Sequence, residues 1–190
     1  MWLRPSLRFP VVPLLILAAS SSVAAQEGEI ARAFEYLNRV RQNPAAFSTE
    51  IGVNLRNIAP RPQLTWNESL ANAAQSKAED MARRNYFSHV TPEGRGINIM
   101  IHEAGYRLVD AFLDRRRNNN FESISAGCYG GTATIMRLIL DEGVRGAGHR
   151  KHLLGLEFWA NALDIGIGFA ANPGSRYRYY WVVVIAKHDF

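Results

Sequence analysis

Apolar residues recur every three to four positions through the N-terminal and central parts of the chain, a spacing typical of helices with one buried face. This spacing predicts helices over residues 27–41, 68–85, 96–104 and 132–142, and a further helical turn over 149–154. The clearest apolar positions, in the first two helices, are Ile30, Phe34, Leu37, Val40, Leu70, Ala74, Ala78 and Met81. Most of the chain before residue 155 is therefore expected to be helix and connecting loop.

The pattern changes to that of strands near the C-terminus. Residues 164–170 alternate apolar side chains with glycine, and residues 179–186 are almost continuously bulky and β-branched. Turn-forming residues at 172–175 predict an antiparallel hairpin, whose second strand is expected to be covered on both faces. A short strand is also predicted over 121–125. Together these elements predict an α+β fold, an α-β-α sandwich with a central antiparallel sheet.

The first 25 residues have the pattern of a secretory signal peptide. Arg4 and Arg8 precede an apolar run over 11–19, which small residues follow. The run is too short to span a membrane comfortably, so no stable membrane anchor is expected after cleavage. We therefore interpret residues 1–25 as a signal peptide and residues 26–190 as one domain, secreted to an extracellular or periplasmic location.

Composition narrows the class of protein further. With 190 residues, 47% of them hydrophobic, and a formal charge of +5, the chain is typical of one globular domain. Loss of the leader removes two arginines and no acids, which leaves 20 basic and 17 acidic residues. No basic stripe is interleaved with aromatic residues, so no nucleic-acid partner is expected. Cys128 is the only cysteine, which excludes an intrachain disulfide and predicts a small buried hydrophobe.

Candidate chemistry gathers in residues 140–154. Asp141 is expected near the C-terminus of a helix that Gly143 ends, where the helix dipole disfavours an anion unless a cation, a proton or a metal ion lies nearby. His149 begins the next helical turn and is followed by two basic residues. Taken alone, a stretch of this kind is more often a solvated basic turn than a functional site.

Two more candidates lie elsewhere in the sequence. His89 comes just after the helix predicted over 68–85, and Glu122 has apolar neighbours in the short strand. A carboxylate buried in such a strand needs a partner. His102 opens a near match to the zinc-protease helix motif, but Tyr106 stands where the second histidine is required, so this match is discounted.

Short motifs along the chain resemble, in the same order, those of the CAP (or SCP) superfamily, which comprises the cysteine-rich secretory, antigen 5 and pathogenesis-related 1 proteins. These motifs are Leu37-Asn38-Arg39-Val40-Arg41, Leu64-Thr65-Trp66-Asn67-Glu68-Ser69-Leu70-Ala71, Asn85-Tyr86-Phe87-Ser88-His89, Phe121-Glu122-Ser123-Ile124 and Gly148-His149-Arg150. The chain is most similar to short bacterial-type members without disulfides. The resemblance implies an α-β-α sandwich whose central cleft brings together two histidines and two acids that can hold a divalent ion.

Carried onto this sequence, the resemblance makes His89 and His149 the two histidines and Glu122 the first acid. The second acid is Asp141 or Glu142, and Asp141 is favoured. The expected metal ligands are His89, His149 and Glu122, a set that suits zinc and tolerates magnesium or calcium. The remaining histidines are expected to be structural or at the surface, and these are His102, His152 and His188.

Three functions are compatible with such a cleft. The first is binding of a small hydrophobic ligand such as a lipid or a sterol, which predicts an exposed apolar patch near the site. The second is metal-assisted extracellular hydrolysis of a peptide or a cell-envelope component, with Glu122 or Asp141 as the base. The third is a non-catalytic protein that binds a cell-surface partner through its loops. The sequence places ligand binding slightly ahead of hydrolysis and leaves open whether the protein is an enzyme.

Overall fold

The computed structural model of the chain describes residues 14–188. Its helices are α1 (Leu14–Gln42), α2 (Ser48–Ile51), α3 (Glu68–Arg84), α4 (Ile97–Glu103), α5 (Gly131–Leu140) and α6 (Gly148–Leu153). Its strands are β1 (Thr65–Trp66), β2 (Glu122–Ala126), β3 (Asp164–Ala171) and β4 (Tyr179–Ala186). Single 3₁₀ turns occur at Pro44–Phe47, Asp110–Phe112 and Glu157–Trp159. The helices and strands predicted from periodicity are therefore present, with shifts at their ends.

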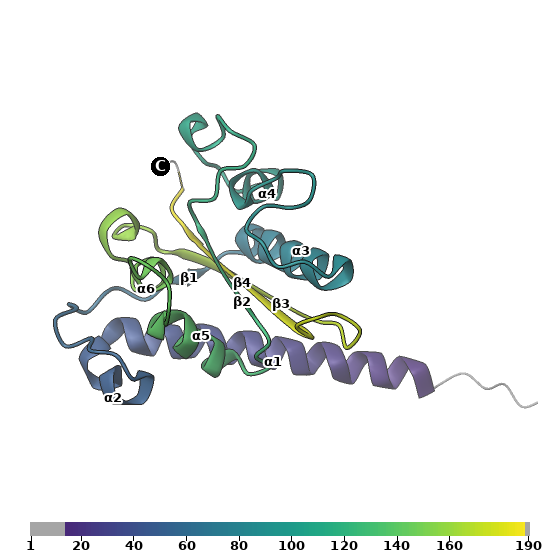
Figure 1. The fold of residues 1–190 in the computed structure, drawn as a ribbon, viewed down its shortest axis with the longest axis horizontal. Helices are drawn as coiled ribbons and strands as arrows, with labels where there is room; N and C mark the ends of the chain where they lie inside the picture. Colours follow the sequence, from purple (N-terminus) through teal and green to yellow (C-terminus); the bar gives the residue numbers. More distant parts are fainter. Residues whose placement is uncertain (1–13, 189–190) are drawn as a thin grey trace, which may run out of the picture.

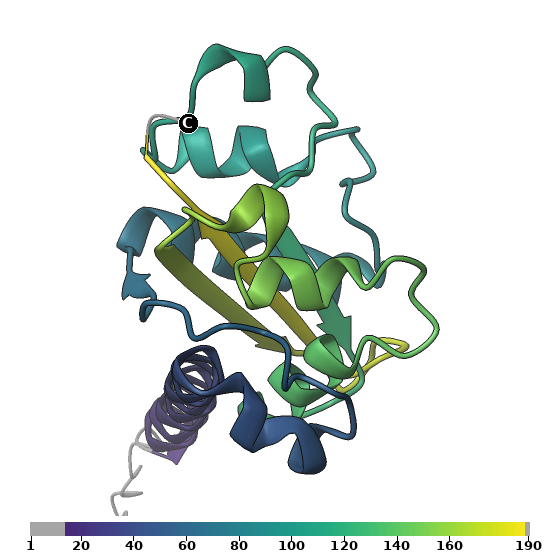
Figure 2. The ribbon, with the colours of Figure 1, turned by 90° about the vertical axis from the view of Figure 1, so that its left-hand side faces the viewer.

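The four strands form one sheet in the order β1-β3-β4-β2. The C-terminal hairpin pairs β3 with β4 in antiparallel register, and β2 is antiparallel to the other side of β4. The two-residue β1, which the sequence pattern did not predict, lies parallel to β3. Strand β2 therefore forms one edge of the sheet, as Figure 2 shows.

Helices cover both faces of this sheet, as the apolar pattern of β4 predicted. Figure 1 shows α1 and α5 on one side and α3 and α4 on the other. On the α1 side, Trp181 and Val183 of β4 belong to one apolar cluster, and on the α3 side Val182 and Val184 belong to a second. Burial of both faces supplies most of the hydrophobic stabilisation. The predicted α-β-α sandwich is confirmed.

Glycines let α3 approach β3 closely. A Cβ atom on Gly166 would lie 2.1 Å from the amide nitrogen of Ala71, and one on Gly168 would lie 2.3 Å from the carbonyl carbon of Ala74. The alternation of glycine with apolar residues in β3 therefore has a packing cause, because any side chain at these two positions would push the helix away from the sheet.

Three local predictions need correction. Helix α5 ends at Leu140, and Asp141 rather than Gly143 takes the left-handed conformation that stops it, with φ of 54°. Cys128 is half-buried instead of buried, and its thiol lies 3.8 Å from the carbonyl oxygen of Gly130. Helix α1 begins at Leu14 rather than near residue 27, since helical geometry continues into the segment interpreted as a leader.

The leader itself is only partly covered by the structure. Residues 1–13 lie outside the described residues, and cleavage of the leader stays a prediction. Within residues 14–188, no helix combines the length and the apolar character needed to cross a bilayer.

Candidate functional site

The first predicted pair, His89 and Glu122, comes from two distant segments. His89 lies five residues beyond α3, whose last turn ends at Asn85 in the left-handed conformation, and Glu122 is the first residue of β2. The Nδ1 atom of His89 lies 2.7 Å from Oε2 of Glu122. The Glu122 side chain is fully buried, whereas 40% of the His89 side chain is exposed. The buried carboxylate therefore has the partner that its apolar surroundings required.

Burial of Glu122 has an electrostatic consequence. Loss of solvent raises the pKa of this carboxyl, and the nearby His89 and Lys77 lower the pKa only in part. The second oxygen, Oε1, has no hydrogen-bond partner within the described residues. The carboxylate thus depends on its histidine and on a nearby ammonium group for stabilisation.

The second pair, His149 and Asp141, joins the end of α5 to the start of α6. The Nδ1 atom of His149 lies 2.7 Å from Oδ1 of Asp141, and the Asp141 side chain is fully buried. The amide of Arg150 donates to the other carboxylate oxygen over 3.2 Å. Glu142 is exposed, so Asp141 rather than Glu142 accompanies the second histidine. Asp141 can serve as this partner because its left-handed backbone turns the side chain away from the helix that it ends.

Arg150 fixes the geometry of this helix junction. Its Nε donates to the carbonyl of Ile139 at 2.7 Å and its Nη2 to the carbonyl of Leu140 at 2.6 Å. These carbonyls end α5 and have no partner inside the helix, so the guanidinium satisfies them and complements the negative helix end. The junction therefore holds His149 at a defined position.

The two histidine rings lie close to each other. Their centroids lie 6.5 Å apart, and the ring planes are inclined by 33°. Because each Nδ1 atom lies against a carboxylate, the neutral ring carries its proton on Nδ1 and keeps a lone pair on Nε2. Both Nε2 atoms are therefore available as metal ligands or as proton acceptors.

The structure thus brings together the predicted residues His89, Glu122, Asp141 and His149, but as two histidine–carboxylate pairs. Glu122 lies behind His89, so its contact is with the ring of His89 rather than with an ion shared by the two rings. Among residues 14–188, no group of three or more His, Cys, Asp or Glu side chains is arranged to hold a metal ion. A ligand role for Glu122 therefore stays a prediction.

Lys77 of α3 lies beneath the first pair and was not predicted as a site residue. It is completely buried, and its ammonium donates to the carbonyl of His89 at 3.3 Å and to the hydroxyl of Tyr86 at 3.4 Å. Burial lowers the pKa of Lys77, while the carboxylates of Glu122 and Asp80 counteract this by raising it. One feature of the sequence indicates this burial: Lys77 lies between Ala74 and Ala78, on the face of α3 that packs against the sheet.

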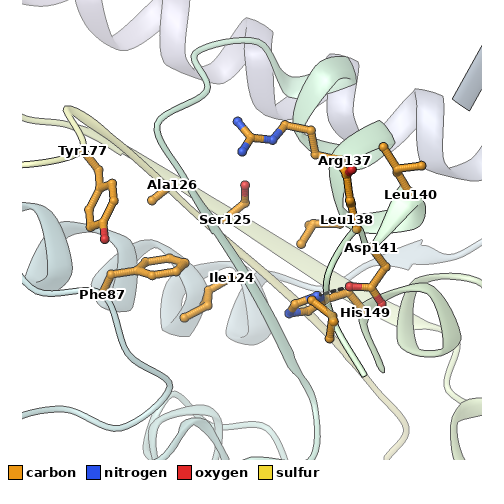
Figure 3. Close-up of a pocket in the computed structure, with 12 residues that line it drawn as sticks. Phe87, Ile124, Ser125, Ala126, Arg137, Leu138, Leu140, Asp141, His149 and Tyr177 are labelled. Atoms are coloured by element: carbon orange, nitrogen blue, oxygen red, sulfur yellow. Dashed lines mark hydrogen bonds and ion pairs between the residues drawn. The ribbon is translucent and has the colours of Figure 1, made fainter. Parts of the chain in front are cut away.

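A groove opens beside the second pair, along the edge of β2. We call it the β2–α5 groove, and its volume is about 330 Å³. Figure 3 shows the side chains that line it, from β2, α5, the loop after α5, α6, the segment after α3 and the turn between β3 and β4. The apolar lining residues include Phe87, Ile124, Leu138, Val144 and Tyr177, and the polar ones Ser125, Arg137, Asp141, Glu142 and His149. Phe87 and Val144 are 40% and 42% exposed, so apolar side chains are accessible in the groove that His149 also lines.

The other histidines lie away from the ring pair. His152 is buried in α6, with Nδ1 2.8 Å from the hydroxyl oxygen of Ser123 and Nε2 3.4 Å from the carbonyl oxygen of Ile185. Burial lowers its pKa to about 3, so the ring is neutral and Nε2 donates to the carbonyl. His102 is exposed on α4, and His188 stacks on a tyrosine ring with 4.1 Å between centroids. None of the three takes part in the paired site.

Comparison with known proteins identifies the family. Residues 34–185 match the model of the CAP family, described as the cysteine-rich secretory protein family, and the chain belongs to it. No curated protein matches the sequence significantly.

Two solved structures match the chain at low sequence identity. An extracellular protein containing an SCP domain from Bacillus anthracis strain Ames is 19% identical, with a TM-score of 0.49. That match covers 85% of this chain but only 41% of the Bacillus anthracis chain. An outer surface protein from Borrelia burgdorferi is 14% identical, with a TM-score of 0.48, over 81% of this chain and 93% of that one.

Proposed function

We propose that this CAP domain is exported and holds a divalent cation between His89 and His149. The observation that supports this is the pair of Nδ1–carboxylate contacts, both 2.7 Å long, which orient the rings and leave Nε2 of each for coordination. Zinc is favoured because imidazole nitrogen is one of its usual ligands, whereas magnesium and calcium prefer oxygen. Water would complete the coordination shell.

We also propose that the β2–α5 groove binds a small ligand with apolar groups next to this cation. A lipid or a sterol is the ligand class that the sequence favours, and the exposed side chains of Phe87 and Val144 offer apolar contact area for such a molecule. The opposite part of the lining is polar and includes Arg137 and His149. The groove therefore suits a ligand that has both apolar and polar groups.

Calorimetric titration with zinc, magnesium and calcium tests the cation. The wild-type mature domain is expected to bind zinc most tightly, and His149→Ala is expected to weaken binding by about tenfold or more because a ligand is lost. His102→Ala is the matched control, since this exposed histidine lies outside the site. Equal zinc uptake by the wild type and His149→Ala would exclude the proposed coordination.

A second candidate function is metal-assisted hydrolysis of a peptide or a cell-envelope component. The two histidine–carboxylate pairs favour it, because a carboxylate behind an imidazole fixes the tautomer and stabilises the ring when Nε2 accepts a proton. A bound zinc ion would supply an activated water molecule and polarise a substrate carbonyl. Asp141 and Glu122 would then act through their histidines rather than directly on the substrate.

Turnover separates this candidate from simple binding. Incubation of the zinc-loaded domain with a peptide library is expected to release cleavage products, detected by mass spectrometry, if the site is catalytic. His149→Ala should then abolish product release, and His102→Ala should leave it unchanged. Binding without any product from the wild type would restrict the site to ligand binding.

A further inference from the structure

The register of β2 leaves one row of its backbone groups without partners. In an antiparallel pair, alternate residues direct both their N–H and C=O groups toward the neighbouring strand. The amide of Ile185 donates to the carbonyl of Phe121, and the amide of Gly127 donates to the carbonyl of Tyr179. The odd-numbered residues of this segment therefore face β4, and the groups of Glu122, Ile124 and Ala126 point away from it.

No other segment pairs with this outer row. Strand β2 ends the sheet order, and within residues 14–188 no backbone or side-chain hydrogen bond reaches the amides or carbonyls of Ile124 and Ala126. An unpaired edge of this kind is a template for another strand. Natural proteins usually shorten, charge or cover such an edge, whereas here it opens into a groove.

The β2–α5 groove follows this open edge, because side chains from both faces of the sheet line it. Ile124 and Tyr177 belong to the apolar cluster on the α3 side, and Leu138 belongs to the cluster on the α5 side. Figure 3 shows β2 passing between these two sets, with Ile124, Ser125 and Ala126 beside the groove. A ligand in the groove therefore lies where an added strand would lie.

We propose that the β2–α5 groove binds a peptide in extended conformation, which pairs with the outer edge of β2. This inference rests on the proposed function in taking the same groove as the ligand site, and it replaces the lipid or sterol that the sequence favours with a peptide. Main-chain hydrogen bonds from Ile124 and Ala126 would supply affinity, and alternate side chains of the peptide would supply specificity. The carboxylate and ring of the Glu122–His89 pair lie at one end of this edge, so a bound peptide would run toward the histidines.

The lining predicts which side chains the peptide carries. Residues of an added strand point alternately to the two faces of the sheet. On the α3 side they would meet Phe87, Ile124 and Tyr177, so apolar residues fit there. On the α5 side they would meet Ser125 and Arg137. The guanidinium of Arg137 has no hydrogen-bond or ion-pair partner within residues 14–188, so an acidic residue fits opposite it.

The outward amides and carbonyls of β2 make a lipid or a sterol a less favourable occupant of the groove than a peptide. An acyl chain or a sterol ring system has no row of donors and acceptors, so it would cover the amides and carbonyls of Ile124 and Ala126 without pairing them. A backbone group that is buried without a hydrogen bond loses its hydration and gains nothing in return. A peptide avoids this cost.

Amide hydrogen exchange, measured residue by residue by NMR, tests the pairing directly. The probe is an acetylated and amidated pentapeptide with valine at positions one, three and five, glutamate at two and serine at four. In the free domain the amides of Ile124 and Ala126 are expected to exchange faster than the paired amides of Ser123 and Ser125. Saturation with the probe should slow exchange at both positions by about tenfold or more, because each amide gains a hydrogen bond.

Matched variants and a modified probe isolate the backbone contribution. Ala126→Pro removes an outward N–H without touching the bonds to β4, and it should weaken binding of the probe by about tenfold. Ala126→Ser keeps the N–H and should bind like the wild type. A probe with alternate N-methylated amides keeps the protein unchanged and should also lose binding, so the result does not depend on folding of the proline variant. Arg137→Gln should weaken the glutamate probe but not one with glutamine in its place.

Two outcomes would overturn the inference. One is unchanged exchange at Ile124 and Ala126 when the probe is bound. The other is saturation of the groove by an oleoyl or sterol probe but not by the pentapeptide. Failure of the cation proposal gives a different result, because zinc titration would then show no effect of His149→Ala while protection of the β2 amides persists.

Discussion

Burial determines the charge of individual side chains around the paired site. Lys77, Glu122 and His152 all lie in the interior. Loss of solvent lowers the pKa of Lys77 and His152 and raises the pKa of Glu122, so it favours the neutral form of each. Lys77 and Glu122 partly compensate each other, whereas His152 is held by Ser123 and Ile185, which are both uncharged. His152 is therefore the residue at which burial has the clearest consequence for stability.

We predict that His152 makes the fold less stable in acid. The unfolded histidine titrates near pH 6.5, and the folded ring has a pKa of about 3. Between these values the unfolded state binds more protons than the folded state. The contribution of neutral His152 to stability is therefore fully present above pH 6.5 and is lost as the pH falls toward 3. This residue alone should lower the free energy of unfolding by about 1.4 kcal/mol per pH unit in that window.

Denaturant titrations at pH 7, 6 and 5 measure this contribution. His152→Gln keeps an amide that can donate to Ile185 but does not titrate, so its stability should depend less on pH than that of the wild type. His102→Gln, at an exposed position, should leave the pH dependence unchanged. Identical slopes for the wild type and His152→Gln would contradict the prediction.

Helix α3 packs closely against β3 because two positions of the strand have no side chain. Helix α3 carries Lys77 and leads into the segment that ends in His89, so its distance from β3 sets the position of the first pair. Gly166 and Gly168 fix that distance because a methyl group at either would overlap the helix backbone.

We predict that Gly168→Ala destabilises the fold by about 1–3 kcal/mol, the range typical of overpacked interiors. The added methyl group would lie 2.3 Å from the backbone of Ala74 and would force α3 outward. Gly174→Ala is the matched control, since its methyl group would meet only the Asn172 side chain, at 3.4 Å, in an exposed turn. Thermal unfolding of the two variants checks this, and an equal loss of stability in both would count against the close approach.

One buried arginine, Arg41, connects segments that are far apart in the sequence. Arg41, near the end of α1, donates to the carbonyl of Leu153 at 2.8 Å and to that of Pro62 at 3.2 Å. It has no solvent exposure, and burial lowers its pKa to about 10. The guanidinium therefore links the N-terminal helix to the α6 turn that carries His149.

We predict that Arg41→Ala destabilises the whole domain by about 3 kcal/mol, because it creates a cavity and leaves the buried carbonyl of Leu153 without its partner. Arg56→Ala, at an exposed position, should change stability by less than about 0.5 kcal/mol. Chemical unfolding followed by circular dichroism measures both. A change near zero for Arg41→Ala would mean that water replaces the guanidinium.

Periodicity in the sequence determined the helices, the C-terminal hairpin and the layering of the sandwich. These properties depend on the spacing of apolar residues along one segment, and that spacing can be read locally. The motifs around His89, Glu122 and His149 likewise indicated the site, through the resemblance to the CAP family. The missed β1 and the wrong end of α5 show where local patterns stop being sufficient. A two-residue strand has no period, and Asp141 ends its helix in a conformation that depends on its contacts with His149 and Arg150.

Only the tertiary structure decided how the site residues meet. Three features depend on pairing between segments far apart in the chain. They are the nitrogen of His89 that faces Glu122, the acid that accompanies His149, and the open edge of β2. The buried position of Lys77 follows from the contact of α3 with β3 and β4, which no single segment encodes. Local periodicity determined the elements because each buries its own apolar face, while the donors and acceptors of the site became known only once distant backbones were brought within hydrogen-bonding distance.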